Sequence, residues 1–298
     1  MSPLSLAPAA RKVFGMSLDI SPAPLRPSVA QPVLPPRAQG AVALSVQARD
    51  GATHLAGLRQ SGCLKCILPR VFRPAAEAVL VNTAGGITGG DRIDVSATLR
   101  AGTQLSITTQ AAERIYRTVD GSMGQVATKI EVGEAAVLYW LPQETILFDR
   151  ARLSRRLEID LAADARLLLC ETLVFGRAAM GEQVRDLHLE DRITVTRGGA
   201  ALYRDGIRLN GDATAILRGA AVGAGAGAVA TLVFADPEAE ALLARVRALL
   251  PETAGASLLG DNLLVLRALA DDSLSLRRYL IPVLELLSGQ SLPAVWRL

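Results

Sequence analysis

The chain has few of the side chains on which catalysis and nucleic-acid recognition usually depend. Its 298 residues include two histidines, His54 and His188, and only 4% are aromatic. A Ser-His-Asp site needs a histidine beside a nucleophile, and no Gly-x-Ser-x-Gly segment is present. A nucleic-acid surface needs clustered Lys and Arg with aromatics between them, whereas the basic residues are dispersed and the net charge is only +3. The composition argues against hydrolytic enzymes and against nucleic acid as a partner.

Cysteine is also scarce. Three cysteines, an odd number, do not make a disulfide framework, so we expect a reducing compartment, the cytoplasm. Cys63 and Cys66 have the spacing of a redox or half-zinc motif. The segment 64–68 has the pattern of a strand, on which residues three apart point to opposite faces, and no second Cys-x-x-Cys pair completes a zinc site. We interpret the pair as strand packing and Cys170 as a core residue.

The chain lacks a hydrophobic run long enough to cross a membrane. The longest, 220–235, is shorter than the roughly 20 residues that a spanning helix needs, and its first half is rich in glycine. Residues 1–36 contain eight prolines and no uninterrupted apolar stretch of the kind found in a secretory signal. We therefore expect no membrane segment, a disordered Pro-rich extension over residues 1–38 and a single domain over 39–298.

What the chain does have is a succession of short apolar alternations, each with polar residues at the intervening positions. This period of two is typical of half-buried strands. It occurs at Val42, Leu44 and Val46, at Ile93 and Val95, at Leu105 and Ile107, at Leu157, Ile159 and Leu161, and at Ile193 and Val195. Two short unbroken apolar runs, 78–81 and 167–169, suit strands that are buried on both faces.

Turn signals separate these segments and support a mainly β fold. They are Asp50-Gly51, Ala101-Gly102, Asp120-Gly121, Gly198-Gly199, Asp205-Gly206 and Asn210-Gly211-Asp212. No repeat of fixed period is visible, but an irregular β-helical solenoid is compatible with the pattern, since irregular coils need not share sequence.

Two helices are predicted towards the C-terminus. The first begins with Asp236 as N-cap and Pro237 at the first helical position, and its apolar residues recur at helical spacing until Pro251 ends it. The second runs from Ser273 to about Ser288, contains Pro282 and ends at Gly289.

The most unusual segment carries two Gly-Gly pairs, at 85–86 and 89–90, and is closed by Asp91. Four glycines in six positions indicate a tight turn or a crowded corner. Gly85 and Gly90 have the separation of a P-loop, but Asp91 stands where that loop needs lysine, and Ile87 stands where a dinucleotide fingerprint needs its second glycine. A carboxylate at this position would repel phosphate and attract a cation.

Three further segments carry polar groups whose role is open. The segments 140–149 and 174–182 mix apolar residues with charges and suit either buried polar turns or surfaces covered by a partner. Asp186, His188 and Glu190 alternate along a probable strand and suit either a weak cation site or a solvated polar face, of which we favour the second.

Four segments of the chain together resemble one family. They read NTAGGITGGD at 82–91, TQAAERIYR at 109–117, WLPQETILFD at 140–149 and VFGRAAMGE at 174–182. In this order they are similar to the motifs of the urease accessory protein UreD family, called UreH in some organisms. The resemblance extends more loosely from about residue 40 to the C-terminus and does not cover the Pro-rich extension.

The resemblance implies a maturation protein rather than an enzyme. It implies an irregular β-helical body with two helices, which acts with UreF and the GTPase UreG on apo-urease so that nickel enters the urease metallocentre. UreE is the implied donor of nickel to the GTPase. No cofactor is expected to stay bound, and the failed P-loop match agrees with a GTP site in the partner.

The resemblance also implies an internal passage through which nickel moves in transit. Such a passage needs weak oxygen ligands, because Ni²⁺ ranks high in the divalent affinity order and a cage of His and Cys would trap it. The candidates are Asp91, Asp205, Glu113 and Glu182. The alternatives are a scaffold without any metal path, in which Asp91 and Asp205 only cap glycine turns, and a β-helical carbohydrate-active enzyme, for which no pair of acid/base carboxylates can be assigned.

Overall fold

The computed structural model describes residues 36–71, 74–177 and 180–297. The predicted disordered extension lies almost entirely outside the described residues, so it stays a prediction. From Arg37 onward the chain forms one compact unit.

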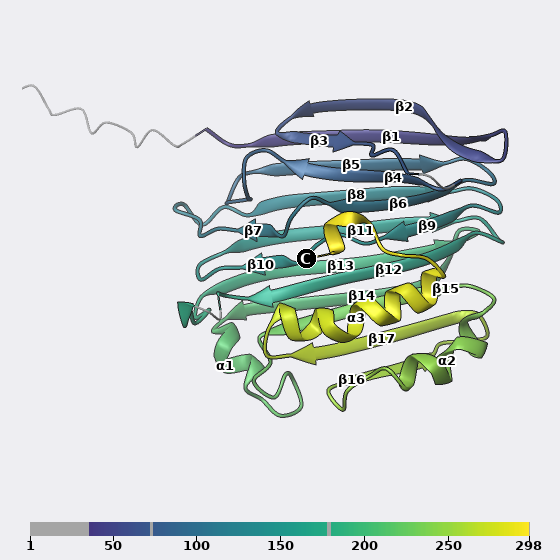
Figure 1. Ribbon diagram of the computed structural model, residues 1–298. Coiled ribbons are helices and arrows are strands. Elements are labelled where there is room, and N and C mark those ends of the chain that lie inside the picture. The colour runs from purple at the N-terminus through teal and green to yellow at the C-terminus, as the bar shows by residue number, and fades with distance from the viewer. Residues whose placement is uncertain (1–35, 72–73, 178–179, 298) are drawn as a thin grey trace, which may run out of the picture. The chain divides into compact units, whose positions relative to one another are not determined.

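Two β-sheets make up most of this unit (Figure 1). Sheet A has seven strands, which lie in the order β14 (Ala200–Gly211), β13 (Leu187–Arg197), β11 (Arg152–Leu161), β8 (Gly124–Val132), β5 (Arg92–Leu99), β1 (Gln39–Arg49) and β2 (Ala52–Gly62). Sheet B has ten strands, of which eight lie in the order β16 (Ala254–Leu258), β17 (Leu263–Ala270), β15 (Ala228–Ala235), β12 (Arg166–Phe175), β9 (Val137–Trp140), β6 (Gln104–Thr109), β4 (Ala76–Asn82) and β3 (Leu64–Ile67). The two short strands β7 (Glu113–Ile115) and β10 (Thr145–Leu147) pair with each other beside β12.

The chain alternates between the sheets, which makes it a solenoid. It passes from β4 to β5, from β6 to β8, from β9 to β11 and from β12 to β13, and these strands are parallel to their neighbours within each sheet. The result is a β-solenoid-like arrangement of about four turns, which confirms the predicted fold class. The coils begin at Ala76, Gln104, Val137 and Arg166, and this uneven spacing explains why the sequence shows no fixed repeat.

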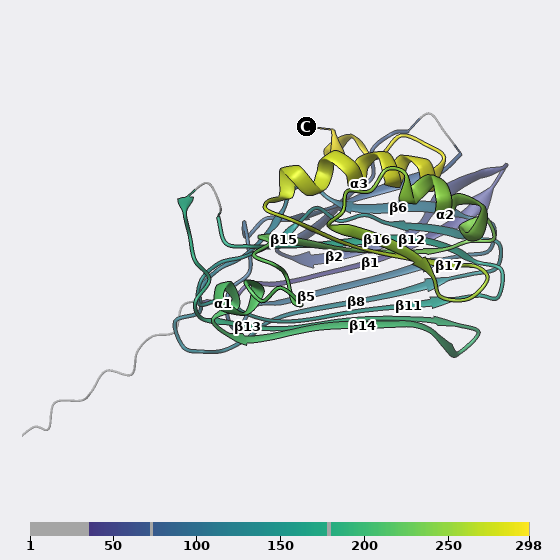
Figure 2. The same ribbon diagram turned by 90° about the horizontal axis from the view of Figure 1, so that it is seen from below.

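The core lies between the two sheets, and a second core lies on the far side of sheet B. The alternating residues predicted for β1, β5, β11 and β13 point inward, and they meet Leu105, Leu138 and Leu167 of sheet B. Helices α2 (Ala239–Arg247) and α3 (Ser273–Ser288) cover the outer face of sheet B, whereas no helix among the described residues lies across the outer face of sheet A (Figure 2). Sheet B is therefore buried on both faces, which explains the unbroken apolar run of β12, and sheet A keeps a regular alternation.

Both predicted helices are confirmed. Helix α3 has the predicted bounds, with the Asp272 carboxylate accepting a hydrogen bond from the Ser275 N–H and Gly289 ending the helix in a left-handed conformation. Helix α2 begins at Ala239, two residues after the predicted first position Pro237. Its N-cap is Glu238, and the predicted N-cap Asp236 instead accepts a hydrogen bond from the Glu238 N–H in the turn before the helix.

One turn prediction was wrong. Asp205-Gly206 lies within β14, where it pairs in register with Arg192 and Ile193 of β13, because strand pairing overrides the local turn preference. The signal at Asn210-Gly211-Asp212 coincides with the end of β14. Asp212 is the N-cap of a further helix of five residues, α1 (Ala213–Leu217), and its carboxylate accepts a hydrogen bond from the Ala215 N–H. In the part of the chain that the structure describes, no helix is long and apolar enough to span a membrane.

The cap of α3 yields a stability prediction. We expect Asp272→Ala to lower the free energy of unfolding by about 1 kcal/mol, because the first turn loses its side-chain acceptor. The Ser275 N–H lowers the pKa of Asp272, so this contribution is present at neutral pH and is lost as pH falls through the folded-state pKa. Urea denaturation at neutral and acidic pH measures both effects. Asp271→Ala, at the exposed neighbouring position, is the control and should change little.

Candidate functional site

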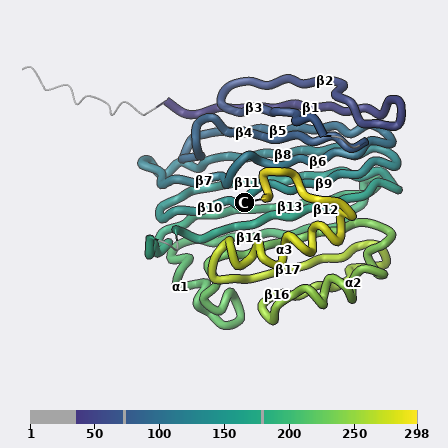
Figure 3. The backbone as a smooth tube through the Cα atoms, in the orientation of Figure 1, coloured from purple at the N-terminus to yellow at the C-terminus, as the bar shows by residue number. Residues whose placement is uncertain are grey.

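The four motif segments occupy one end of the solenoid. Each overlaps the connection from a strand of sheet B to a strand of sheet A, and these connections are 83–91, 110–123, 141–151 and 176–186. We call this region the motif end. The stacking of the coils brings the four connections side by side, on the left of the tube in Figure 3. Segments far apart in sequence thus form one continuous region.

Backbone hydrogen bonds join the four connections into a ladder. The Ile87 N–H donates to the Arg114 carbonyl (2.8 Å), and the Tyr116 N–H donates back to the Ile87 carbonyl (2.7 Å). β7 pairs in parallel with β10, and β10 pairs with the end of β12. The Gly176 N–H completes the series by donating to the Leu147 carbonyl (2.8 Å). The motif end is therefore fixed by the same backbone pairing as the sheets.

The double Gly-Gly loop allows the first two connections to pack closely against each other. A Cβ on Gly86 would lie 2.3 Å from Cε2 of Tyr116 and 2.7 Å from the Arg114 carbonyl oxygen. A Cβ on Gly89 would lie 2.2 Å from the carbonyl oxygen of Ser122. Gly86 and Gly89 permit close contact with the second connection, and Gly85 and Gly90 adopt positive φ angles, so the four glycines are explained without any phosphate ligand.

Asp91 closes this loop from within. Its side chain is 5% exposed, and its two oxygens accept hydrogen bonds from the Ala38 N–H (2.7 Å) and the Thr88 N–H (2.8 Å). Both oxygens are thus used by the backbone, as expected for a residue that caps a turn.

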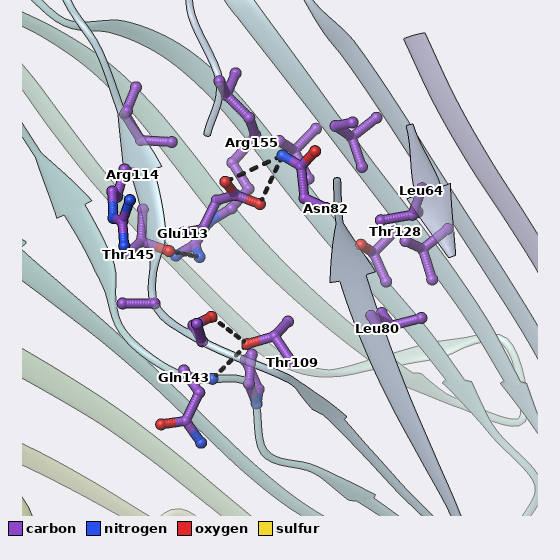
Figure 4. A pocket seen from close by; sticks show the side chains of 18 of the residues that line it. Leu64, Leu80, Asn82, Thr109, Glu113, Arg114, Thr128, Gln143, Thr145 and Arg155 are labelled. Carbon is purple, nitrogen blue, oxygen red and sulfur yellow. Dashed lines mark hydrogen bonds between the residues drawn. The ribbon is translucent and has the colours of Figure 1, made fainter. Parts of the chain in front are cut away.

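A cavity of about 170 Å³ runs inward from the motif end between the two sheets. Its lining extends from exposed residues of the connections, including Gly85 and Gln110, to the buried side chains of Trp140 and Glu171. Glu113 is the carboxylate near the outer part, where the Asn82 amide donates to both of its oxygens at 3.2 Å (Figure 4). Burial raises the pKa of Glu113, and the Asn82 hydrogen bond partly opposes this shift.

Three charged side chains meet at the inner end of the cavity. Arg155 donates from Nη1 to Glu171 Oε2 (2.6 Å), and from Nε and Nη2 to the two oxygens of Asp191 (2.9 and 2.6 Å). Their side chains are 11%, 6% and 5% exposed. Burial lowers the pKa of Arg155, but the two carboxylates outweigh it and keep the guanidinium charged. Burial raises the pKa of Glu171 despite its bond to Arg155.

The sequence contained a signal for this cluster that our prediction missed. The strand alternation that places Leu153 and Leu157 inward also places Arg155 inward, and the same holds for Asp191 between Leu189 and Ile193. A charged residue at an inward position needs a partner, because an unpaired buried charge is costly. Extending the predicted alternations that begin at Leu157 and Ile193 by two residues toward the N-terminus reaches both charged residues.

The third connection is a buried polar turn. Gln143 and Glu144 are 5% and 8% exposed, so the alternative that a partner covers this part of 140–149 was wrong. Arg277 of α3 donates from Nη1 to Gln143 Oε1 (2.7 Å) and to Glu144 Oε1 (3.0 Å), and from Nη2 to the Trp296 carbonyl (2.8 Å). The Trp296 indole in turn donates to the Leu141 carbonyl (3.0 Å). This cluster lies in the core beneath α3, whereas the Arg155 cluster lies between the sheets.

Glu182 fastens the fourth connection to the third. Its carboxylate accepts from Arg177 Nε (2.7 Å) and from the Asp149 N–H (3.2 Å). Burial raises the pKa of Glu182, but Arg177 and the backbone donors outweigh it and lower the pKa overall. The Arg177 guanidinium also lies 4.8 Å from the centre of the Phe148 ring. Met180 nearby is 73% exposed, which leaves part of 174–182 open to a partner.

Asp205 lies away from the motif end. In β14 it accepts a hydrogen bond from Arg267 Nη2 of sheet B (2.6 Å). It also lines a second cavity of only about 10 Å³, whose walls include Arg155 and Glu171. The structure therefore does not gather the four predicted metal residues: Asp91, Glu113 and Glu182 lie on three different connections, and Asp205 lies beyond the Arg155 cluster.

The other candidate ligands are dispersed. Cys63 and Cys66 are free thiols, and burial raises the pKa of Cys66 to about 11. Asp186 forms an ion pair with Arg152 (2.8 Å), and Glu190 lies between Arg192 and Arg208. Over the described ranges, no three His, Cys, Asp or Glu side chains are grouped so that they could hold a metal ion.

Comparison with known proteins identifies the family. A family model described as UreD urease accessory protein matches residues 38–297, which include all four connections of the motif end. The chain belongs to the UreD urease accessory protein family. Proteins named urease accessory protein UreD are similar to it throughout: one from Ruegeria pomeroyi is 51% identical over 80% of this chain and 93% of its own length. One from Ruegeria sp. is 50% identical over 94% and 98%, and one from Rhizobium leguminosarum bv. viciae is 44% identical over 91% and 99%.

The glycine contacts of the UreD motif end can be tested by substitution. We expect Gly86→Ala to lower the free energy of unfolding by about 3 kcal/mol, because the added methyl group must displace Tyr116 or the Arg114 backbone. Gly121→Ala is a matched control in the second connection: its backbone is also left-handed, but nothing lies within 4 Å of the added Cβ. Backbone strain alone should cost it about 1 kcal/mol. Equal losses for the two variants in chemical denaturation would contradict the packing explanation.

Proposed function

We propose that this chain is a maturation protein that binds apo-urease and, together with UreF and the GTPase UreG, enables nickel to enter the urease metallocentre. The observation that carries the proposal is the family match over residues 38–297. The chain acts as a scaffold in the cytoplasm and not as an enzyme, and UreE contributes indirectly as the nickel donor. Nickel is its cargo, so no cofactor is retained.

The motif end offers surfaces for such partners. Val119 in the second connection is 72% exposed and Met180 in the fourth is 73% exposed. Exposed apolar side chains on backbone that is held in place by hydrogen bonds are suited to protein contacts, because little conformational entropy is lost when they are covered. These residues support the scaffold part of the proposal.

The interior supports a passage for the cargo. The cavity of about 170 Å³ connects Glu113 near the motif end with the Arg155 cluster, and the small second cavity continues to Asp205. Carboxylates spaced along the interior provide oxygen ligands that bind Ni²⁺ more weakly than His or Cys, as transit requires. Of the four predicted residues, Glu113 and Asp205 suit this role.

A scaffold without a metal path is the second candidate function. It is favoured by Asp91 and Glu182, whose carboxylates are already used to close and fasten the connections of the motif end. These two residues need no metal to explain them. The candidates differ in what Glu113 and Asp205 do during activation.

Conservative substitutions separate the two candidates. Glu113→Gln and Asp205→Asn keep the size of each side chain and remove its charge. If cargo passes these residues, urease activation in cells that carry the complete urease system should fall roughly tenfold, the scale seen when a group near a metal is lost. Pull-down of UreF, UreG and urease should be unchanged. Normal activation by the double variant would leave the pure scaffold, and failure of the unaltered chain to capture any of these partners would contradict both candidates.

A further inference from the structure

Strand β14 is the last strand at one edge of sheet A, and alternate residues direct their backbone groups away from the sheet. The His188 N–H of β13 donates to the Ala151 carbonyl, so even-numbered residues of β13 pair with the β11 side and odd-numbered residues pair with β14. In the register of β13 with β14, the backbone groups that face outward therefore belong to the even-numbered residues from Arg204 to Asn210.

Most of these outward groups have no hydrogen-bond partner. The Gly206 N–H donates to Oδ1 of Asp205 (2.9 Å), whereas the outward groups of Arg204, Arg208 and Asn210 are unpaired among the residues that the structure describes. A row of unpaired N–H and C=O groups is a template on which another strand can pair.

The two edge strands of sheet B differ from β14, because side chains cover part of their backbone. The Cys66 N–H of β3 donates to Oε1 of Gln60 (2.9 Å). The Ala256 carbonyl of β16 accepts a hydrogen bond from Nε of Arg247 in α2 (2.9 Å). Both contacts occupy groups that an added strand would need, so β14 is better suited to pairing than either edge of sheet B.

Sheet B also extends beyond β14, which leaves part of its inner face without an opposing strand. The small second cavity is lined by Ile207 of β14 and Val229 of β15, so these two strands lie opposite each other. Sheet B continues from β15 to β17 and β16, which lie below β14 in Figure 1. Val265 and Leu269 of β17 pack against the core between the sheets but are only partly buried. A further strand beside β14 would cover them.

Charged side chains determine which strand this edge accepts. Arg204 and Arg208 are exposed on the outer face of β14, and Arg192 is exposed on the neighbouring strand β13. The carboxylate between them is that of Glu190, which lies 3.9 Å from Arg192 and 3.8 Å from Arg208. Three guanidiniums thus accompany one carboxylate on the outer face of these two strands, and positive charge is in excess.

The same arginines argue against a second copy of this chain as the occupant. If two β14 strands paired antiparallel about Gly206, Arg204 of one copy would face Arg208 of the other, and like charges directly opposite each other are destabilising. A strand with carboxylates at these positions gains cross-strand ion pairs instead. Its intervening apolar side chains would point inward, towards Val265 and Leu269.

We propose that β14 is a docking edge for an extended acidic segment of a partner protein, which adds to sheet A as an eighth strand. Backbone hydrogen bonds to Arg204, Arg208 and Asn210 supply affinity, and the arginine side chains select a segment with alternate carboxylates. The apolar face of the segment closes the open side of the two-sheet stack beside β17. This surface lies along an edge of sheet A and does not depend on the proposed function.

A synthetic peptide tests the chemistry of this edge. The probe is a fluorescent peptide of about eight residues, in which glutamate alternates with valine. Fluorescence polarisation with the full chain should show saturable binding. Arg204→Glu combined with Arg208→Glu should weaken this binding at least about tenfold, because two attractive charge pairs become repulsive. The same double variant should bind a lysine-valine peptide more tightly than the unaltered chain does.

Two controls separate strand addition from simple charge attraction. In the proposed pairing the glutamates of the probe direct their N–H groups towards β14, so a probe that is N-methylated on its glutamates keeps its charge and should not bind. Arg245→Glu combined with Arg278→Glu changes the net charge of the chain equally, at exposed positions of α2 and α3, and should leave binding unchanged.

Amide hydrogen exchange locates the bound peptide. The N–H groups of Arg204, Arg208 and Asn210 should gain protection when the probe binds, whereas those of Ile207 and Leu209, already paired with β13, should change little. The proposal is overturned by the absence of binding up to about 1 mM probe, by equal binding of the N-methylated probe, or by equal loss of binding in the α2 and α3 control. A dimer of the unaltered chain that pairs through β14 would also overturn it.

Discussion

Parallel pairing of successive coils is the constraint on which the remaining structure depends. Each coil hydrogen-bonds to the next in both sheets, so a connection can lie only beside the connection of the preceding coil. The four motif segments, spread over a hundred residues of sequence, therefore form one ladder that runs from Ile87 through Ile115 and Leu147 to Phe175. Gly86 and Gly89 of the first connection are a consequence of this stacking, because the second connection leaves no space for a Cβ at either position.

The partners of the buried charged side chains are also determined by the stacking of the coils. A flat stack of two sheets has inner positions on every strand, and most are filled by Leu, Ile and Val. Where an inner position of sheet A carries Arg155 or Asp191, its partners must come from neighbouring strands. On the far side of sheet B, Arg277 plays the corresponding part for the turn at Gln143. A buried arginine, Arg155 of sheet A on one side and Arg277 of α3 on the other, thus lies against each face of sheet B and is satisfied by residues distant in sequence.

Much of the fold could be predicted from the sequence, because local patterns determine it. The period of two located the half-buried strands, and helical spacing with Gly289 at its end located α3. The turn expected at Asp205-Gly206 was wrong because pairing with β13 outweighs a dipeptide preference. The candidate site was accessible only in part: Glu113 was found by resemblance, whereas the partnership of Arg155 with Glu171 and Asp191 depends on which strands become neighbours. No local pattern contains that information.

The buried turn at Gln143 bears on how the chain folds. Solenoid coils can in principle add one after another, each on the edge left by the previous one. The third coil departs from this scheme, because the acceptors of Gln143 and Glu144 are satisfied by Arg277, 134 and 133 residues later in the chain. Until α3 docks, two polar side chains in a largely apolar layer remain without their partner. Formation of the third coil is thereby coupled to a helix formed much later, so the stack acquires the long-range cooperativity of a globular domain.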